Sequence, residues 1–411
     1  MDLIADFHLH TKYSAATSKN MDIENLAYAA KMKGISLLGS GDFTHPLQFR
    51  EIKEMLVFND GIAMYNGIYF ILSVEVSNVF NIENKTYKVH TVILSPSLDI
   101  AEQINETLSK HGNLSEDGRP TLNYSTYEMN EELKAISRDI ALIPAHIWTP
   151  WFSLFGAHFG ADDINELYPD DSLIIALETG LSSDPLMNWM VSKIDKYTLV
   201  SNSDAHSLEN LGREGNKIRL KQITYKEIVN GIRTGNAMLK TYEYFPQEGK
   251  YFNDGHRKCN INLSPEEAEK IRGICPVCKR KLTIGVMHRI KKMADRKYGE
   301  KKPNWKGYQH IIPLKQVIAK VKNKTKESKT VQSIYNDMIS YFGNEFAIYE
   351  ANENDLLAYT DKDIANALIK IKKEQVYWKP GYDGVFGEFF LNGNVENKNK
   401  QEMLKRWFDE V

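Results

Sequence analysis

The sequence predicts an α/β fold in three parts: a (β/α) barrel in residues 1–240, a small zinc-finger-like module in residues 241–300, and a mixed α/β or helical region in residues 301–411. Three observations lead to this prediction. Strand-like and helix-like segments alternate in the first part, the three cysteines of the chain are clustered after it, and Lys and Arg become abundant there. With 411 residues, of which 42% are hydrophobic, the chain is long enough for one barrel core and a second, smaller unit.

The first expected strand and helix show the pattern clearly. Residues 3–9 alternate apolar and polar side chains, which places His8 and His10 on one face of a strand. Residues 22–33 carry an apolar stripe at helical spacing, and Gly34 follows at the position of a helix C-cap. Further strands are expected at residues 35–39, 68–77, 87–95, 140–145, 172–178 and 197–203.

A polar residue stands at or near the end of these strands, before the next helix. His146, Thr179 and Asp204 each come directly after an expected strand. This order is typical of a parallel (β/α) barrel, in which the active site lies at the carboxyl ends of the strands. A doubly wound open sheet is the structural alternative. The barrel is favoured because the candidate residues follow many strands, whereas an open sheet binds ligands at one switch point.

The cysteine segment predicts a small metal-binding module. Cys259, Cys275 and Cys278 cannot pair off among themselves, which favours metal binding in a reducing compartment over a disulfide framework. His256 lies three residues before Cys259, so His256 and the three cysteines have spacing acceptable for a structural Cys3His zinc site. Asn262 stands where a four-cysteine ribbon would have a cysteine. Either His256 replaces the missing ligand, or the module is held by packing alone.

The charge of the chain is unevenly distributed. The formal net charge is −2, but residues 251–330 contain 21 Lys and Arg against 7 Asp and Glu. Such a basic segment is typical of a surface that holds a polyanion, with a solvated lysine-rich surface as the alternative. No secretory signal pattern is visible, and no apolar run approaches the roughly 18–20 residues of a membrane helix. We therefore expect a cytoplasmic, nucleoid-associated protein with no membrane partner.

Nine residues in the barrel region have side chains that bind divalent cations. The pair His8-x-His10 on a strand points two imidazoles to one face, and Asp204-x-His206 does the same after the last strand. Buried imidazoles and carboxylates are costly unless a cation compensates for their charge and lone pairs. Two or three such cations can neutralise phosphate oxygens, activate a water and stabilise a leaving alkoxide. The nine candidate ligands are His8, His10, Asp42, His45, Glu75, His90, His146, Asp204 and His206.

These residues lie in recognisable motifs. The motifs are DFHLHT at residues 6–11, GDFTH at 41–45, VEV at 74–76, His90, PAH at 144–146 and NSDAH at 202–206. In type and order they resemble the PHP (polymerase and histidinol phosphatase) superfamily. The resemblance implies a distorted (β/α)7 PHP barrel with two or three divalent ions, for which a mixed nitrogen and oxygen ligand set suits Zn, Mn or Fe.

The same resemblance assigns ligands to ions by motif order. It implies that Glu75 bridges two ions, that His8, His10 and Asp204 hold one of them, and that His90 and His146 hold the other. Asp42 or His45, together with His206, would serve the third. Glu178 is left open as a tenth ligand or as a partner of a ligand. The expected catalytic residues are His8, His10, Glu75, Asp204 and His206.

Further stretches resemble a narrower family over nearly the whole chain. They are HIWTPW at residues 146–151, ALETGLSSDP at 176–185, GHRKC at 255–259, LTIGVMHR at 282–289 and PGYDG at 380–384. Together they look like the endonuclease Q type of DNA repair enzyme found in archaea and some bacteria. The resemblance implies metal-dependent cleavage of the phosphodiester on the 5′ side of a deaminated base (uracil, hypoxanthine or xanthine) or an abasic site. Asn262 departs from the paired-cysteine pattern, which affects the finger and not the barrel.

A lesion nuclease needs a pocket for a flipped base and contacts to the DNA backbone. Three aromatic residues closely following His146 can line such a pocket or wedge the duplex, with packing at the barrel rim as the alternative. A hydroxyl-containing loop and two arginines can contact the base or phosphates, although a surface ion pair is an equal alternative for Arg213. The substrate-binding candidates are Trp148, Trp151, Phe152, Thr179, Gly180, Ser182, Arg213 and Arg289.

Other functions explain fewer of these features. A small-molecule phosphatase of the histidinol-phosphate kind explains the metal ligands but not the basic segment. A 3′–5′ exonuclease would use free DNA ends and ignore lesions, and a non-catalytic DNA-binding protein with a decayed barrel would have lost ligands. Damaged DNA is therefore the expected partner, with an affinity that falls steeply with salt, whereas a phosphatase should not bind DNA at all. No convincing short motif for recruitment by a sliding clamp or another repair protein is visible.

Overall fold

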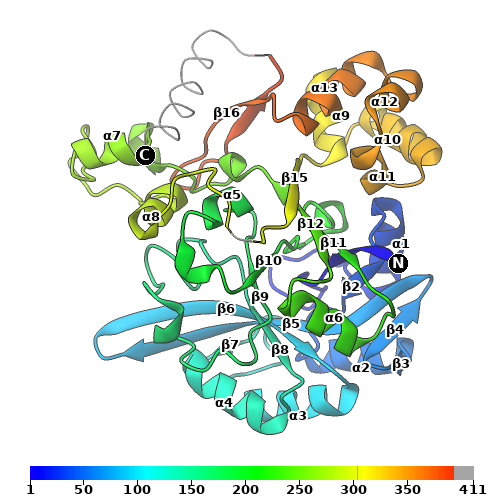
Figure 1. The fold of residues 1–411 in the computed structure, drawn as a ribbon, viewed down its shortest axis with the longest axis vertical. Coiled ribbons are helices and arrows are strands. Elements are labelled where there is room, and N and C mark those ends of the chain that lie inside the picture. Colours follow the sequence, from blue (N-terminus) through cyan, green and yellow to red (C-terminus); the bar gives the residue numbers. More distant parts are fainter. Residues whose placement is uncertain (303, 393–411) are drawn as a thin grey trace.

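The computed structural model describes residues 1–302 and 304–392 and shows a mixed α/β architecture around an 11-stranded sheet (Figure 1). The strands of the first part of the chain are β1 (Asp2–Asp6), β2 (Leu37–Gly39), β3 (Phe58–Asn59), β4 (Ile62–Tyr65), β5 (Ile68–Ile82), β6 (Lys85–Ser95), β7 (Thr121–Leu122), β8 (Ala141–Pro144), β9 (Ala176–Glu178), β10 (Thr198–Val200), β11 (Gly215–Arg219) and β12 (Met238–Tyr244). The α/β class predicted from the sequence is confirmed.

The central strands pair in the order in which they occur in the chain. β1 pairs with β2, and β2 with β5, both in parallel. β5 pairs with β6, and β6 with β8, both antiparallel. On the other edge of β1 lies β11, followed by β12. The middle of β5 and most of β6 are buried, which explains why both are rich in apolar and β-branched residues.

The expected pattern of a strand followed by a helix is wrong for β5 and β6. These strands form one long hairpin with no helix between them, so Glu75 and His90 lie inside the hairpin and not at carboxyl ends of parallel strands. The turn uses Glu83, whose φ of 53° is left-handed. The register pairs Ser77 with His90 and Glu75 with Val92. Because every second residue of a strand faces the same side, Glu75 and His90 share one face of the hairpin.

The strands after β8 lead back to β1 through isolated β-bridges. β8 contacts the chain before β9 through a bridge between Leu142 and Ile174, and β9 pairs in parallel with β10. Leu9, just beyond β1, then bridges Ala205, just beyond β10. The segments that carry the first and last candidate ligands therefore lie side by side, although they are far apart in sequence.

Helices accompany this sheet. The predicted helix at residues 22–33 is confirmed: the Asp22 side chain accepts the Asn25 N–H at its start, and Gly34 ends it with a φ of 92°. None of the helices in the described residues is long and apolar enough to cross a membrane. The helices of this part are α1 (Ile23–Lys33), α2 (Pro46–Met55), α3 (Leu98–Leu108), α4 (Thr126–Ile136), α5 (Pro185–Asn188) and α6 (Tyr225–Arg233), with short 3-10 helices at Ile164–Glu166, Ser192–Ile194, Leu208–Asn210 and Pro246–Glu248.

The cysteine-containing segment folds into a small module. It consists of the hairpin β13 (Asp254–His256) and β14 (Ile261–Leu263), a 3-10 turn (Arg257–Cys259), α7 (Pro265–Lys270) and α8 (Val286–Met293). Ser264 caps α7 in a reciprocal capping box. The module has a small buried cluster of its own, formed by Ala268, Cys275 and Leu282, whereas Val286, Met287 and Ile290 of α8 belong to the large core of the preceding part of the chain. Outside α8, apolar burial therefore contributes little to the stability of this module.

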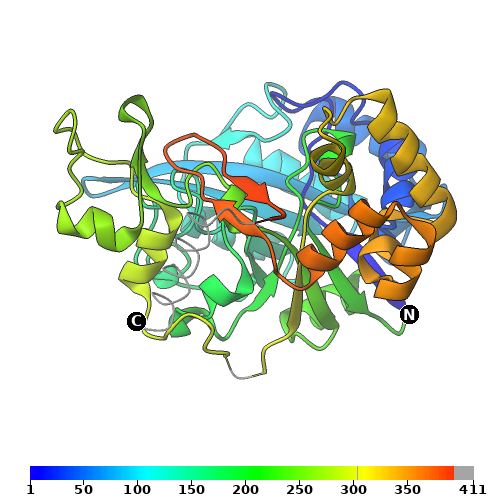
Figure 2. The same ribbon diagram turned by 90° about the horizontal axis from the view of Figure 1, so that it is seen from above.

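The last part of the chain adds one strand to the large sheet and then forms a helical unit with its own core. β15 (Gly307–Ile311) pairs in parallel with β12. The following elements are α9 (Leu314–Lys322), α10 (Lys329–Phe342), α11 (Glu345–Glu350), α12 (Glu353–Tyr359), α13 (Lys362–Lys372), β16 (Tyr377–Lys379) and β17 (Glu388–Phe390). The β16–β17 hairpin lies between this helical unit and the cysteine-containing module (Figure 2).

Candidate active site and metal-ligand groups

A first group of four candidate ligands converges on one point. His8 and His10 follow β1, Glu75 lies in β5, and Asp204 follows β10. His10 Nε2 lies 3.1 Å from both Glu75 Oε2 and Asp204 Oδ1. His8 Nε2 lies 3.4 Å from Glu75 Oε2 and 3.6 Å from Asp204 Oδ1. These ligand atoms all lie within 4.8 Å of one another, so they can share one cation.

Glu75 belongs to a second group as well. Its Oε1 atom lies 2.7 Å from His90 Nδ1 and 3.0 Å from His146 Nε2, and the two nitrogens are 3.3 Å apart. One carboxylate thus faces the two groups with different oxygens, as a ligand that bridges two cations does. We call the residues of both groups the Glu75 cluster: His8, His10, Glu75, His90, His146 and Asp204.

The chemistry of the Glu75 cluster fits divalent cations. The cluster is largely buried, with the Asp204 side chain 28% exposed, and His8 Nε2 has no hydrogen-bond partner among the described residues. Burial raises the pKa of the Glu75 carboxyl, but the neighbouring His90 and His8 lower it well below its ordinary value. Burial lowers the pKa of His90 to about 4, which favours a neutral ring with a free lone pair. An ionised carboxylate among imidazole nitrogens at these distances is a suitable ligand set for a transition metal.

Glu178 of β9 supports two of these ligands. Its carboxylate oxygens both lie 3.1 Å from His8 Nδ1, and Oε2 accepts the backbone N–H of His146 at 2.7 Å. Asn202 donates to Oε1 at 2.8 Å. A carboxylate on Nδ1 fixes the tautomer and orientation of His8 and leaves Nε2 free for a cation. Glu178 therefore has the geometry of a partner of a ligand, one of the two roles that the sequence left open.

Two further carboxyl groups are buried behind Glu178. Glu243 accepts the Thr179 hydroxyl at 3.0 Å, and burial raises the pKa of Glu243 to about 7. Burial and the neighbouring Glu243 raise the pKa of Glu214 well above its ordinary value. Thr179 is itself fully buried and also bonds to the Val200 carbonyl. This geometry does not support the expected contact between Thr179 and DNA.

The loop after Thr179 packs against the cluster. Gly180 has a φ of 63°, and a Cβ at this position would lie 2.5 Å from the Cβ of His146. Glycine is therefore required here for the loop to approach the ligand. Ser182 is half-buried, and its hydroxyl lies 3.5 Å from that of Thr149. Ser182 stays a candidate for contact with a substrate, whereas Gly180 acts through its backbone.

The three residues expected at a third ion lie around the cluster. Asp42 accepts the N–H and the hydroxyl of Thr11, and its Oδ1 lies 3.4 Å from His10 Nδ1. His45 accepts the Leu47 N–H and caps α2. The ring of His206 lies 4.3 Å from that of His10, measured between centroids. In the described part of the chain these three residues do not form a ligand group of their own, and the third ion stays a prediction.

Arg119 is a site residue that the sequence analysis missed. Its Nη1 lies 3.3 Å from Glu75 Oε2, and its side chain is 28% exposed. It therefore places a positive charge at the edge of the cluster and within reach of solvent. Arg119 lies in the loop that connects α3 to β7 and has no metal-binding motif around it, so only the folded structure shows its position.

The backbone at three candidate ligands is strained. Asp42, His146 and Asp204 have φ values of 49°, 30° and 46°. Side chains other than glycine rarely adopt this left-handed region, although Asp and His do so more often than most. Each such residue costs about 1–3 kcal/mol and persists only where the surrounding structure fixes it.

The three aromatic candidates after His146 differ in position. Trp148 is fully buried and donates its indole N–H to Asn188, so its expected role in a base pocket is wrong and packing in the core is its role. Trp151 is half-buried and stacks on His158. Phe152 is half-buried with its ring centroid 5.0 Å from that of His90. Trp151 and Phe152 therefore remain candidates for contact with a base.

The two candidate arginines are engaged by carbonyl groups. Arg213 donates to the carbonyls of Ser203 and Asp204 at 2.8 and 3.1 Å and so holds the loop of a ligand. Arg289 of α8 is buried and donates to the carbonyls of Phe155 and Ala161, and its Nη1 pairs with Asp162. Arg289 ties the small module to the loop after His146. Its geometry does not support the expected direct contact with DNA.

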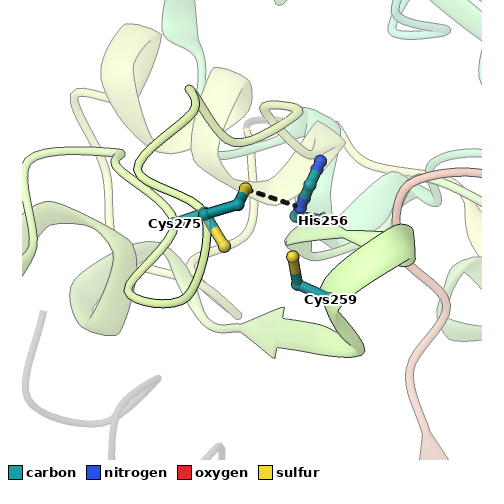
Figure 3. A group of neighbouring side chains, drawn as sticks. His256, Cys259 and Cys275 are labelled. Carbon is teal, nitrogen blue, oxygen red and sulfur yellow. Dashed lines mark hydrogen bonds between the residues drawn. The ribbon is translucent and has the colours of Figure 1, made fainter.

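A third ligand group lies in the small module. His256, Cys259, Cys275 and Cys278 offer ligand atoms within 4.8 Å of one another. Figure 3 shows the side chains of His256, Cys259 and Cys275 converging from the hairpin and the loop before α8. Cys278 Sγ lies 3.5 Å from His256 Nδ1. Although burial raises the pKa of the Cys275 thiol, backbone hydrogen bonds at Cys278 and Val277 lower it to about 6, which favours the thiolate. We call these four residues the cysteine cluster.

Asn262 has a different task from a metal ligand. It accepts a hydrogen bond from Asn253 at 2.9 Å and donates to the Pro380 carbonyl at 2.8 Å, which connects the β13–β14 hairpin to the loop between β16 and β17. This arrangement favours the alternative in which His256 is the fourth ligand.

Parts of the chain are similar to proteins known from sequence. Residues 313–375 match a family described as the MJ0043 C-terminal domain. The uncharacterised protein MJ0043 of Methanocaldococcus jannaschii is 30% identical over 269 residues, which cover 63% of this chain but only 33% of that protein. The uncharacterised protein YqxK of Bacillus subtilis is 28% identical over 410 residues, covering 94% of this chain and 98% of that protein.

Two solved structures resemble nearly the whole chain. The lesion-specific endonuclease PfuEndoQ from Pyrococcus furiosus superposes with a TM-score of 0.86 at 30% identity, covering 97% of this chain and 99% of that one. Endonuclease Q in complex with a 27-mer duplex substrate, with an abasic lesion at the active site, gives a TM-score of 0.85 at 30% identity, covering 96% and 99%. Since sequence identity and fold agree over nearly the whole chain, the chain belongs to the endonuclease Q family.

Proposed function

We propose that this protein is a metal-dependent DNA repair endonuclease that hydrolyses the phosphodiester on the 5′ side of a deaminated base (uracil, hypoxanthine or xanthine) or of an abasic site. The observation that carries the proposal is the position of Glu75, whose two oxygens face two ligand groups at once. The membership of the endonuclease Q family supports the choice of DNA as the substrate. The basic module and C-terminal region have no use in a small-molecule phosphatase.

We propose that β1, β2, β5, β6, β8, β9 and β10 form the distorted seven-stranded barrel expected from the sequence. The pairing order and the bridge that returns to β1 support this arrangement. β6 runs against both neighbours, which is one source of the distortion. We also propose the three parts expected from the sequence: a phosphoesterase region up to about residue 240, a metal-binding module up to about residue 300, and a DNA-binding region after it.

The Glu75 cluster would hold two of two or three divalent ions, drawn from Zn, Mn or Fe, with Asp42 or His45 and His206 at the third. Bound there, such ions supply positive charge for the phosphate oxygens and lower the pKa of an attacking water. Glu178 keeps His8 in the productive tautomer. Arg119 would contact a phosphate oxygen next to the cluster. The cysteine cluster would hold one structural zinc, because four protein ligands leave no open position.

Recognition of the lesion is proposed to involve residues at the rim of the cluster. Phe152 lies beside the ligand His90, and Trp151 lies close by in the same loop. An extruded base would stack on one of these rings, with Ser182 offering a hydroxyl. A Trp151→Ala variant that cuts a uracil duplex as fast and as selectively as the wild type would remove Trp151 from this account.

The deciding experiment uses end-labelled duplexes with one uracil, one hypoxanthine, one abasic site or no lesion, incubated with and without Mn or Zn. A single metal-dependent cut immediately 5′ of the lesion is expected, absent from the undamaged duplex and from an Asp204→Asn variant. A ladder from the DNA ends would instead indicate an exonuclease. Release of phosphate from a small phosphomonoester, with every duplex intact, would contradict the proposal.

A further inference from the structure

A basic groove lies outside the Glu75 cluster, between α9 and the β16–β17 hairpin. It has a volume of about 630 Å³. Six cationic side chains line the groove against three carboxylates, which are Glu209, Glu248 and Glu388. The net charge of the lining is therefore positive. The cationic side chains that line it are Lys33, Arg213, Lys315, Lys320, Lys324 and Lys326.

Some of these cations are already paired and others are not. Lys33 pairs with Glu345, and Lys320 with Glu388. Lys324 and Lys326 are exposed and have no ion-pair partner among the residues that the structure describes. Lysines near the end of α9 also interact favourably with the helix dipole, but this effect fades within one turn and does not account for Lys326.

An exposed aromatic ring completes the groove. Phe386 is 65% exposed, and Lys250 Nζ lies 4.5 Å from the centre of its ring. The loop that carries Phe386 is tightly held: Gly387 donates to the Glu248 carbonyl at 2.9 Å, and a Cβ on Gly387 would lie 2.1 Å from the Gln247 carbonyl oxygen. A fixed backbone therefore presents an apolar ring to solvent beside several lysines.

The groove is connected to the Glu75 cluster through Arg213. This arginine lines the groove, and its guanidinium donates to the carbonyls of Ser203 and Asp204. Asp204 is one of the ligands of the cluster. The groove thus begins directly behind the loop that carries this ligand.

We propose that the groove binds an unstacked stretch of the substrate DNA strand, with phosphates on Lys324 and Lys326 and one base stacked on Phe386. Cationic side chains that follow the backbone, next to an aromatic ring that accepts any base, are the usual elements of single-strand binding. This inference rests on the proposed function, because it takes the DNA substrate as given and assigns where part of it is held.

The test measures the affinity of the full chain for a labelled abasic duplex by fluorescence anisotropy, in an Asp204→Asn background that does not cut. Phe386→Ala is expected to weaken binding about tenfold, and Phe386→Trp to restore it. Lys324→Gln with Lys326→Gln is expected to reduce the slope of log K against log salt by about 2. The exposed pair Lys221, just after β11, and Lys226, in α6, does not line the groove; changed to Gln in the same way, it is the matched control and is expected to leave the slope unchanged.

A second measurement locates the base directly. A duplex with 5-iododeoxyuridine placed at successive positions next to the lesion is irradiated, and the crosslinked peptide is identified by mass spectrometry. A crosslink to the peptide that contains Phe386 is expected at one position. Crosslinks only to other peptides, together with unchanged affinity and salt slope in both groove variants, would overturn the proposal that the groove binds DNA. Lesion-specific cutting by the unmodified protein would still support the proposed function. If the groove variants lost affinity for DNA but the unmodified protein cut none of the duplexes, the proposed endonuclease function would be contradicted and the groove would stand.

Discussion

The Glu75 cluster and the cysteine cluster are built in opposite ways. The first brings together residues from β5 and β6 and from the segments after β1, β8 and β10, which are part of a large apolar core. The second comes from one stretch of 23 residues, from His256 to Cys278, and the buried apolar cluster around it consists of Ala268, Cys275 and Leu282. From this difference we predict that the expected barrel region positions its ligands without metal, whereas the small module depends on metal for its structure.

The largest expected effect tests the bridging role of Glu75. Glu75→Gln removes a charge shared by two groups, so both ions of the cluster should be lost together. Loss of a residue that only supports a metal ligand lowers activity by up to about a hundredfold. Because Glu75 is itself a candidate ligand, we expect cleavage of an abasic duplex to fall by at least that factor. Metal analysis of the purified variant should still find the ion of the cysteine cluster. If the variant kept two ions in the expected barrel region, Glu75 would not bridge them.

The dependence of the small module on metal is tested by Cys275→Ala. Structural zinc sites contribute about 10–16 kcal/mol of apparent binding free energy to small domains. We therefore expect residues 254–283 to lose protection from amide hydrogen exchange, while β1, β2 and β5 keep theirs. The same pattern should follow treatment of the unmodified protein with a chelator. If the module exchanged slowly in both cases, packing alone would hold it, and the contrast with the barrel region would disappear.

The Glu75 cluster also differs from the cysteine cluster in that a carboxylate outside it, Glu178, orients one of its ligands. Glu178→Gln keeps the shape of the side chain but removes the carboxylate on His8 Nδ1. We expect the metal affinity of the barrel region to fall about 10–100-fold, measured by competition with a coloured chelator. Glu132→Gln, at a glutamate that contacts the surface residue His111, is the matched control and should leave the affinity unchanged. Equal affinities in both variants would show that His8 needs no support.

The smallest expected effect concerns the buried carboxyl of Glu243. Burial raises its pKa from 4.5 to about 7, so the folded protein keeps a proton that the unfolded chain releases. The free energy of unfolding should therefore fall as the pH rises from about 4.5 to about 7, by on the order of 3 kcal/mol for this group. Glu243→Gln should remove this part of the pH dependence. Denaturant titrations of both proteins at pH 5, 6 and 7 measure the difference, and parallel curves would refute it.

The sequence predicted the ligands better than their surroundings. His8, His10, Glu75, His90, His146 and Asp204 were all expected, because metal ligands must be particular residue types and their motifs are short and local. Arg119 was missed, since a lone arginine in a loop has no periodic or motif signal. It reaches Glu75 only because the β5–β6 hairpin and the loop before β7 lie together in the fold.

Two kinds of error have a physical cause. Trp148 was expected to face a base because it follows a ligand closely, but neighbours in a loop can point to opposite sides, and its indole is fully buried. The parallel strand pattern failed at β6, since a strand rich in apolar residues looks the same whether its neighbour runs parallel or antiparallel.

The left-handed backbone at Asp42, His146 and Asp204 has a consequence for heat tolerance. Together these residues oppose folding by several kcal/mol, a sizeable share of the 5–15 kcal/mol by which a typical domain is stable. Glycine would relax the chain at each of them while deleting a candidate ligand. Selection of this protein for survival at high temperature, without selection for cleavage, would therefore remove these side chains first.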